Sequence, residues 1–179
     1  MVPFTESPFG IVAGALFTVI LVVAAIGDFR TRRIPNRLVA LLAVLGLAYS
    51  IAAQPVLSGA LRGVEGLLLG LVCWLPFYVL GWLGAGDVKL FAAAGAWLGP
   101  VGAVEGALVG ACAGALLALV WMIRSRGVKR TTEMLGMAAG SPSLLSPGEK
   151  DSRRSTLPYG IAIAFGAIWA GWLPRMLFA

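Results

Sequence analysis

The sequence contains no histidine and few charged residues, and both absences limit the kinds of protein it can encode. Among 179 residues there is no His, which excludes histidine-based acid–base catalysis and histidine metal ligands. Only 12% of the residues are charged and 59% are hydrophobic, against about 25% and about 45–50% in soluble domains. The apolar residues come in repeated blocks of membrane-spanning length, which pair their backbone groups internally as helices. We therefore predict an all-α, polytopic membrane protein.

Cysteine is scarce as well. Cys73 and Cys112 each stand alone in an apolar block and form neither a CxxC pair nor a zinc-ligand spacing. We interpret them as small buried residues, and we expect no metal and no cofactor. The first ten residues contain no Lys or Arg, unlike the basic start of a cleavable signal peptide, so the first apolar block is expected to stay in the protein.

The apolar blocks predict six transmembrane helices, at about residues 9–27, 38–53, 63–83, 88–99, 101–123 and 157–177. The stretch 88–123, in which Lys89 and Glu105 are the only charged residues, is too long for one crossing of a ~30 Å core at ~1.5 Å per residue, and Gly99-Pro100 is its natural break. Residues 1–179 then form a single membrane-embedded domain. Residues 124–156 are rich in Ser, Gly, Pro and charge, and predict a mobile basic cytoplasmic loop within it.

Lysine and arginine follow the first, third and fifth blocks, whereas only Arg62 and Arg175 fall at the opposite ends. The positive-inside rule then makes the basic side cytoplasmic and both termini extracytoplasmic, in a multi-pass protein of the cell (inner) membrane. The high pI needs no nucleic-acid partner, and membrane lipid is the expected one. Glycines spaced four apart, at Gly66/Gly70 and from Gly102 to Gly114, favour close helix packing within the chain, with a homo-oligomer as the alternative.

Two of the eight acidic residues stand out by position. Four of the others lie in the N-terminal tail or in the predicted loop 124–156: Glu6, Glu133, Glu149 and Asp151. Glu65 and Glu105 lie near the starts of spans at the outer face. Asp28 and Asp87 are left, each at a cytoplasmic span end. Because two spans separate them, both must emerge on the same side. The short fourth span, roughly 18 Å at ~1.5 Å per residue, would leave Asp87 recessed below the membrane surface.

A pair of membrane-edge carboxylates is the minimum for an aspartyl protease. One carboxylate, ionised, takes a proton from water, while the other, protonated, donates to the scissile carbonyl, and neighbouring like charges favour a single shared proton. Simpler explanations stay open for both residues. Asp87 follows Gly84-Ala85-Gly86 and suits a helix N-cap, and Asp28 can pair with Arg32 at the end of its span.

Three motifs resemble those of the type IV prepilin peptidases. Asp28 followed by Arg-Arg-Ile-Pro35-Asn36-Arg-Leu is similar to the first catalytic motif, Gly84-Ala-Gly86-Asp87 to the GxGD signature, and residues 157–162 to a third block. The resemblance implies a protease that removes the leader, a class III signal peptide, from prepilin-like substrates at the cytoplasmic face. It cuts after a glycine that precedes the substrate's hydrophobic helix. Asp28 and Asp87 would be the catalytic pair.

The resemblance also implies supporting roles. Lys89 would steady charge or contact substrate, or simply be a lysine that reaches the cytoplasmic edge, and Asn36 would cap the second span after Pro35. Pro158 and Gly160 would leave backbone groups free for an extended substrate strand, or merely start a helix.

Many members of the family carry an additional N-terminal domain with paired CxxC motifs and also N-methylate the new pilin terminus. The sequence contains no such pairs, so we expect the short form, without methyltransferase activity. Two other functions remain as alternatives: a non-enzymatic pilus-assembly scaffold, and a small ion-coupled transporter with Asp28 and Asp87 as ligands, although transport sites tend to lie near the membrane midplane.

Overall fold

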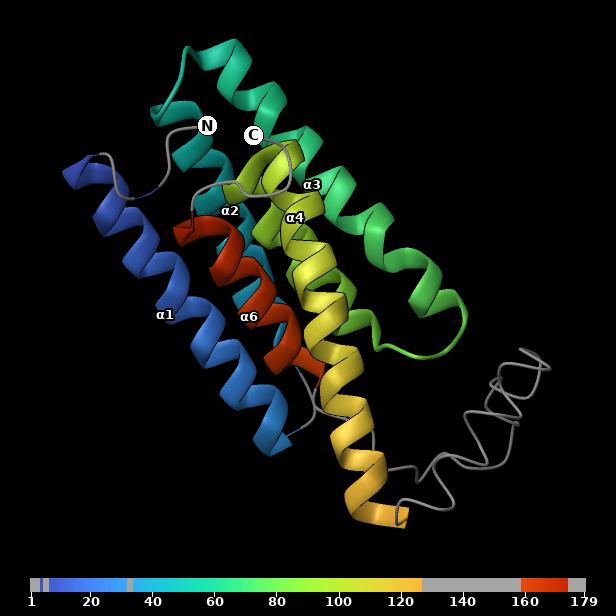
Figure 1. Ribbon diagram of the computed structural model, residues 1–179. Helices are drawn as coiled ribbons and strands as arrows, with labels where there is room; N and C mark the ends of the chain where they lie inside the picture. The colour runs from blue at the N-terminus through green and yellow to red at the C-terminus, as the bar shows by residue number, and fades with distance from the viewer. Residues whose placement is uncertain (1–3, 5–6, 32–33, 127–158, 174–179) are drawn as a thin grey trace.

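A computed structural model describes residues 4, 7–31, 34–126 and 159–173, and not the side chains of residues 121, 122 and 124–126. The described residues form helices joined by short connections, which confirms the all-α prediction (Figure 1). The helices are α1 (Pro8–Thr31), α2 (Asn36–Ala52), α3 (Val56–Val79), α4 (Ala85–Arg126) and α6 (Tyr159–Trp172). Three helical segments are long and apolar enough to cross a membrane: α1, α3 and residues 85–120 of α4.

The long helix α4 is broken at Gly99, where the sequence predicted a break. Gly99 has φ 71° and ψ −178°, a left-handed backbone conformation that favours glycine, and Pro100 follows. Beyond the break the chain reverses direction (Figure 1), and a Cβ built on Gly106 would lie 3.3 Å from Cζ of Phe91. We refer to residues 85–98 and 100–126 as the first and second parts of α4.

The helices cross at glycines, where their backbones approach closely. A Cβ on Gly66 of α3 or on Gly95 of α4 would collide with the other glycine's carbonyl oxygen, and Gly166 of α6 meets Gly106 and Gly110 in the same way. These glycines allow α3, α4 and α6 to pack at short range. The predicted small-residue faces are thus used for packing inside the chain.

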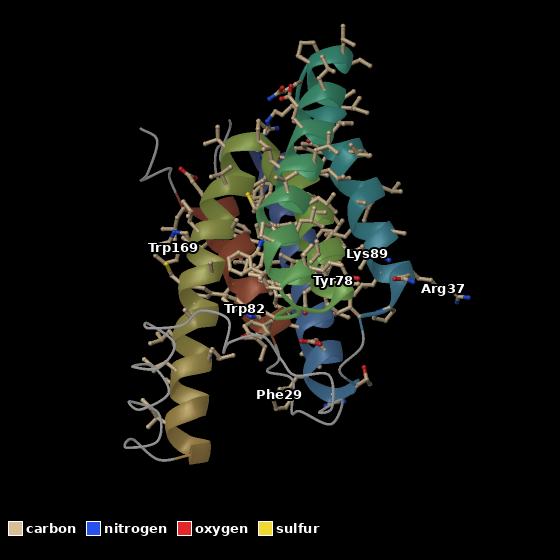
Figure 2. The ribbon with its side chains drawn as sticks, turned by 90° about the vertical axis from the view of Figure 1, so that its right-hand side faces the viewer. Phe29, Arg37, Tyr78, Trp82, Lys89 and Trp169 are labelled. Atoms are coloured by element: carbon tan, nitrogen blue, oxygen red, sulfur yellow. The ribbon has the colours of Figure 1, made fainter. Side chains whose placement is uncertain are left out.

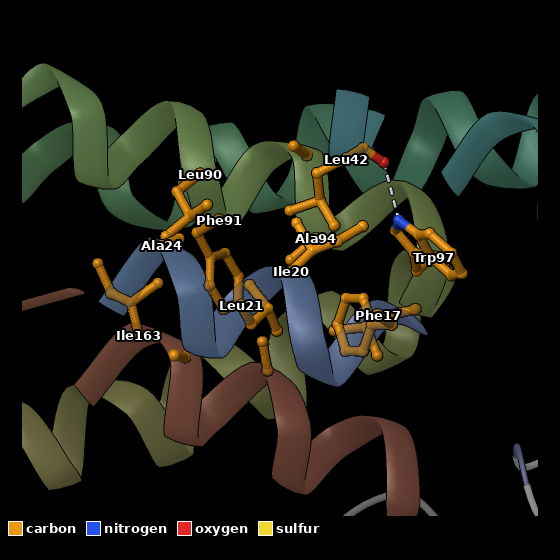
Figure 3. Close-up of a cluster of buried hydrophobic side chains, with 14 of the residues drawn as sticks. Phe17, Ile20, Leu21, Ala24, Leu42, Leu90, Phe91, Ala94, Trp97 and Ile163 are labelled. Carbon is orange, nitrogen blue, oxygen red and sulfur yellow. Dashed lines mark hydrogen bonds between the residues drawn. The ribbon is translucent and has the colours of Figure 1, made fainter. Parts of the chain in front are cut away.

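The first part of α4 lies at the centre of the bundle, surrounded by side chains from its neighbours (Figure 3). Phe17, Leu21 and Ala24 of α1 and Ile163 of α6 belong to the same buried cluster as Phe91. Two side-chain hydrogen bonds hold the C-terminal end of this segment. Trp97 Nε1 donates to the Leu42 carbonyl at 2.8 Å, and Ser50 Oγ donates to the Ala96 carbonyl at 2.7 Å. Asp87 is therefore carried by the most deeply packed helix segment.

The two ends of the bundle differ in what they bring together. Phe4, before α1, packs on Trp172 at the end of α6 with ring centroids 6.0 Å apart. At the opposite end, the end of α1 lies with the starts of α4 and α6 (Figure 1). This second end holds both aspartates.

Two expected helix starts need correction. The N-cap of α2 is Pro35, Asn36 is the first helical residue, and no side chain caps this end, so the prediction that Asn36 caps the helix is wrong. Helix α3 begins at Val56, before the expected start at residue 63, because Arg62 is accommodated within the helix. Its Nη2 donates to the Leu98 carbonyl at 3.0 Å, which supplies a partner where the first part of α4 ends.

The predicted loop lies mostly outside the described residues, which leave out 127–158. Only its first expected residues are described, and these belong to α4, which continues to Arg126.

The prediction that both cysteines are buried is wrong for Cys112, which is exposed, whereas Cys73 is partly buried.

Candidate active site

Asp28 lies in the last turn of α1 and reaches the start of α6. Its Oδ2 accepts a hydrogen bond of 3.1 Å from the backbone N of Gly160. Gly160 is the second residue of α6, so its N–H has no partner within the helix, and the positive end of the helix dipole favours a carboxylate there. A Cβ on Gly160 would lie only 2.7 Å from Asp28 Oδ2 and 3.0 Å from Asp28 Cβ. This contact therefore requires glycine.

Asp87 is the third residue of α4, and one of its oxygens has a structural role. Gly84 N donates to Asp87 Oδ2 at 3.2 Å, and Asp87 N donates to the Gly84 carbonyl at 3.1 Å. Gly84 is thus the N-cap, and Asp87 reaches back to it as the third residue of a capping box does. The alternative in which Asp87 is itself the N-cap is wrong. Asp87 nevertheless stabilises the helix start, because it accepts the hydrogen bond from Gly84 N.

The other oxygen of Asp87 is not explained by capping. Oδ1 is buried and has no hydrogen-bond partner within the described residues. A buried carboxylate oxygen without a partner costs free energy, and native proteins rarely leave one unless it has another use. Among the residues described, Oδ1 thus lacks the kind of partner that Oδ2 has in Gly84 N.

The two aspartates lie within electrostatic reach of one another. The charge of Asp28 acts on Asp87, and the charge of Asp87 acts on Tyr159, the first residue of α6. Three helix ends, those of α1, α4 and α6, therefore place two carboxylates and a phenol hydroxyl in one region. Sequence reasoning missed Tyr159, although it stands between Pro158 and Gly160 in the third motif.

The remaining predicted residues surround the pair less closely. Gly86 packs on Ile34, whose Cβ would be 3.5 Å from a Cβ on the glycine. Lys89 is exposed and follows Asp87 by two residues, about 200° around the helix, so the two side chains leave α4 on opposite sides. Figure 2 shows Lys89 on the side of the molecule where Arg37 lies. It makes no hydrogen bond or ion pair with a described residue. Pro35 and Asn36 are exposed at the start of α2, and Pro158 lies outside the described residues.

A pocket of about 220 Å³ opens beside Tyr159, between α3 and the second part of α4. Aromatic side chains form much of its wall: Trp74, Phe77, Trp82 and Tyr159. Small residues of α4, among them Gly114 and Ala118, form the opposite side. Because Tyr159 belongs to the pocket and also lies near Asp87, the pocket adjoins the carboxylates.

Three of the described helices are long and apolar enough to cross a membrane, and two carboxylates lie together at one end of the bundle. These features define the class: a membrane protein with a candidate acid–base centre. The family model described as the type IV leader peptidase family matches residues 15–119, and the chain belongs to this family. The matched range contains Asp28 and Asp87 and ends within the second part of α4.

The curated relatives that the chain resembles are also named leader peptidases. The chain is 33% identical to the prepilin leader peptidase/N-methyltransferase of Pectobacterium carotovorum over 127 residues, which is 67% of this chain and 43% of that protein. It is 40% identical over 109 residues to the protein of the same name from Escherichia coli K12, covering 55% of this chain and 45% of that one. The chain thus spans less than half the length of these relatives. No solved structure matches it.

Proposed function

We propose that this protein is an aspartyl endopeptidase that cleaves the leader of type IV prepilin-like proteins at the cytoplasmic face of the cell membrane. The observation that carries the proposal is the convergence of Asp28 and Asp87 at one end of the bundle, with Asp87 Oδ1 buried and without a partner in the described part of the chain. Membership in the leader peptidase family supports the reaction class. The names of the relatives support the prepilin substrate.

The mechanism follows from two carboxylates that share one proton. The ionised aspartate removes a proton from a water molecule, and the hydroxide oxygen adds to the scissile carbonyl carbon. The protonated aspartate gives its proton to the carbonyl oxygen, which forms a neutral gem-diol. Collapse of the diol breaks the C–N bond, and the leaving amine takes up a proton from the pair. Asp28, at the positive end of α6, suits the ionised role.

The glycine N–H groups serve as positioning groups in this proposal. Gly160 N holds Asp28, and Gly84 N holds one oxygen of Asp87 so that the other faces the reaction. Backbone donors fixed by helix starts hold a carboxylate with little reorganisation, which is what acid–base catalysis needs. Lys89, on the far side of α4, is proposed to contact substrate or anionic lipid rather than the carboxylates.

The topology that belongs to this proposal has six spans, with both termini outside the cytoplasm. The break at Gly99 supports it, because α4 then supplies two crossings, and α2 and α6 supply shorter ones. The Lys and Arg pattern supports a cytoplasmic location for the end that holds Asp28 and Asp87. Their position at one end of the bundle, away from the midplane, disfavours the transporter alternative.

Incubation of the purified full-length protein with a prepilin-like substrate, followed by mass spectrometry, tests the function. We expect two products separated by a single cut after the glycine that precedes the substrate's hydrophobic segment. An intact substrate under conditions in which an active relative cleaves it would refute the proposal.

A further inference from the structure

Tyr159 begins α6 at the carboxylate end of the bundle, and contacts on two sides fix its position. The N–H of the next residue, Gly160, donates to Asp28 Oδ2 at 3.1 Å. The Tyr159 ring packs on the second part of α4, where a Cβ on Gly114 would lie 3.6 Å from its Cδ1 and 3.7 Å from its Cε1. The start of α6 is thus held between α1 and α4, and the phenol is held with it.

The hydroxyl of Tyr159 has no structural use in the part of the chain that the structure describes. It makes no hydrogen bond with a described residue, although the charge of Asp87 acts on it. The side chain is partly buried and borders the pocket between α3 and α4, and a tyrosine in such a position usually finds a partner for its O–H. The ring alone accounts for the packing on Gly114. The hydroxyl is therefore a donor that the fold itself does not require.

Asp87 does not take up this donor. One of its oxygens, Oδ2, accepts from Gly84 N, and the other, Oδ1, makes no hydrogen bond with any described residue, Tyr159 included. A phenol has an ordinary pKa of about 10, so it is neutral at pH 7 and has a proton to offer in a hydrogen bond. The donor thus suits a substrate atom that approaches the two carboxylates.

We propose that the Tyr159 hydroxyl donates a hydrogen bond to the scissile carbonyl oxygen while that oxygen becomes part of the gem-diol. The proposal rests on the function proposed above. A carbonyl oxygen has two lone pairs, and the protonated aspartate supplies a proton to one of them. The phenol donates to the other and keeps its own proton throughout, so the balance of the reaction is unchanged. A fixed donor at the oxygen where charge develops is among the largest contributions to catalysis of this kind.

The test compares two variants that each lose one hydroxyl, using the full-length protein in detergent or nanodiscs and a prepilin-like peptide as substrate. Tyr159→Phe removes the hydroxyl but keeps the ring on Gly114. Because the donor acts in the transition state, we expect kcat to fall about 100-fold, with KM within about threefold of the wild-type value. Tyr78→Phe removes the same atom from an exposed side chain of α3 and should cleave like the wild type.

A peptide with a hydroxyl in place of the scissile carbonyl gives a second measurement. Its oxygen resembles that of the gem-diol, so Tyr159→Phe should weaken inhibition by this peptide about as much as it lowers kcat/KM. Structural damage would instead lower the midpoint of thermal unfolding and raise KM. Both limbs of the pH–rate profile should stay in place, because the phenol donates to the substrate and to neither carboxylate.

The outcomes distinguish this inference from the function on which it depends. An unchanged kcat in Tyr159→Phe would refute the inference and leave the proposed protease function standing. An acid limb that moves to higher pH would refute it too, because losing a donor to an ionised carboxylate raises the pKa of that carboxylate, and the hydroxyl would then act on an aspartate. A rise in KM alone would place the hydrogen bond before the reaction and contradict the proposal. If the wild type cleaves no peptide, the proposed function fails and the inference fails with it.

Discussion

Asp28 and Asp87 each accept a hydrogen bond from a glycine backbone N–H, one at the start of α6 and the other before α4. The two glycines differ in how much space surrounds them. A Cβ on Gly160 would lie 2.7 Å from Asp28 Oδ2, whereas a Cβ on Gly84 would make an ordinary contact of 3.4 Å with Asp87 Oδ2. Neither has a positive φ, so space alone decides the effect of a methyl group.

Gly160→Ala should therefore displace the Asp28 carboxylate and lower the rate of leader cleavage by about 100-fold, since a shift of roughly 1 Å in a catalytic group costs that much. Gly84→Ala is the matched control and should stay within about threefold of the wild type. A single-turnover cleavage assay measures both. Equal rates for the two variants would mean that the position of Asp28 does not limit the reaction.

We also expect leader cleavage to be independent of metal ions. In the described part of the chain, no three acidic or Cys side chains gather as a metal site, and the whole sequence contains no His. The cleavage rate should therefore be unchanged by EDTA, and a peptide with a hydroxyl in place of the scissile carbonyl should inhibit. A rate that vanishes with EDTA and returns with zinc would show that the acidic residues are metal ligands instead.

At the scale of the helices, close crossings at glycine hold the bundle together. Gly66→Ala would drive a methyl group into the Gly95 carbonyl and should destabilise the protein by about 1–3 kcal/mol, seen as a lower midpoint of thermal unfolding in detergent. Gly27→Ala is the control, because a Cβ at Gly27 meets nothing within 4 Å. It should leave the midpoint unchanged or raise it, since alanine favours helix by up to about 1 kcal/mol.

Helix type and the break in α4 were predictable from the sequence, because both follow from local chemistry. The stretch 88–123 is too long and too apolar for one span, and Gly99-Pro100 supplies the only residue pair in it that suits a reversal. The start of α3 was not predictable. Arg62 looks like a boundary in the sequence, but its guanidinium donates to the Leu98 carbonyl, a partner 36 positions away.

The candidate site was predictable only in part, for the same reason. Motifs identified Asp28, Asp87 and Gly160, but the contact between Asp28 and Gly160 joins residues 132 positions apart. The position of Tyr159 near Asp87 depends on where the start of α6 meets the start of α4. Periodicity and spacing do not determine such contacts.

At the scale of the whole molecule, the six-span topology predicts which connections face the cytoplasm. In a background of Cys73→Ala and Cys112→Ala, a cysteine at Ala53, after α2, should react with a membrane-impermeant reagent added to spheroplasts. A cysteine at Ser143, in the basic segment of the sequence, should react only after lysis. Labelling of Ser143→Cys from outside would invert the topology and remove the cytoplasmic active site.

The most direct test of the central claim, that Asp28 and Asp87 form one catalytic pair, is prepilin cleavage by their amide variants. Asp28→Asn and Asp87→Asn each remove a proton donor or acceptor while keeping the shape of the side chain. Glu65→Gln, an exposed carboxylate on α3 far from the pair, is the control. We predict that both asparagine variants fold and leave the substrate intact in mass spectrometry, while Glu65→Gln cleaves normally. Cleavage by either asparagine variant at close to the wild-type rate would contradict it.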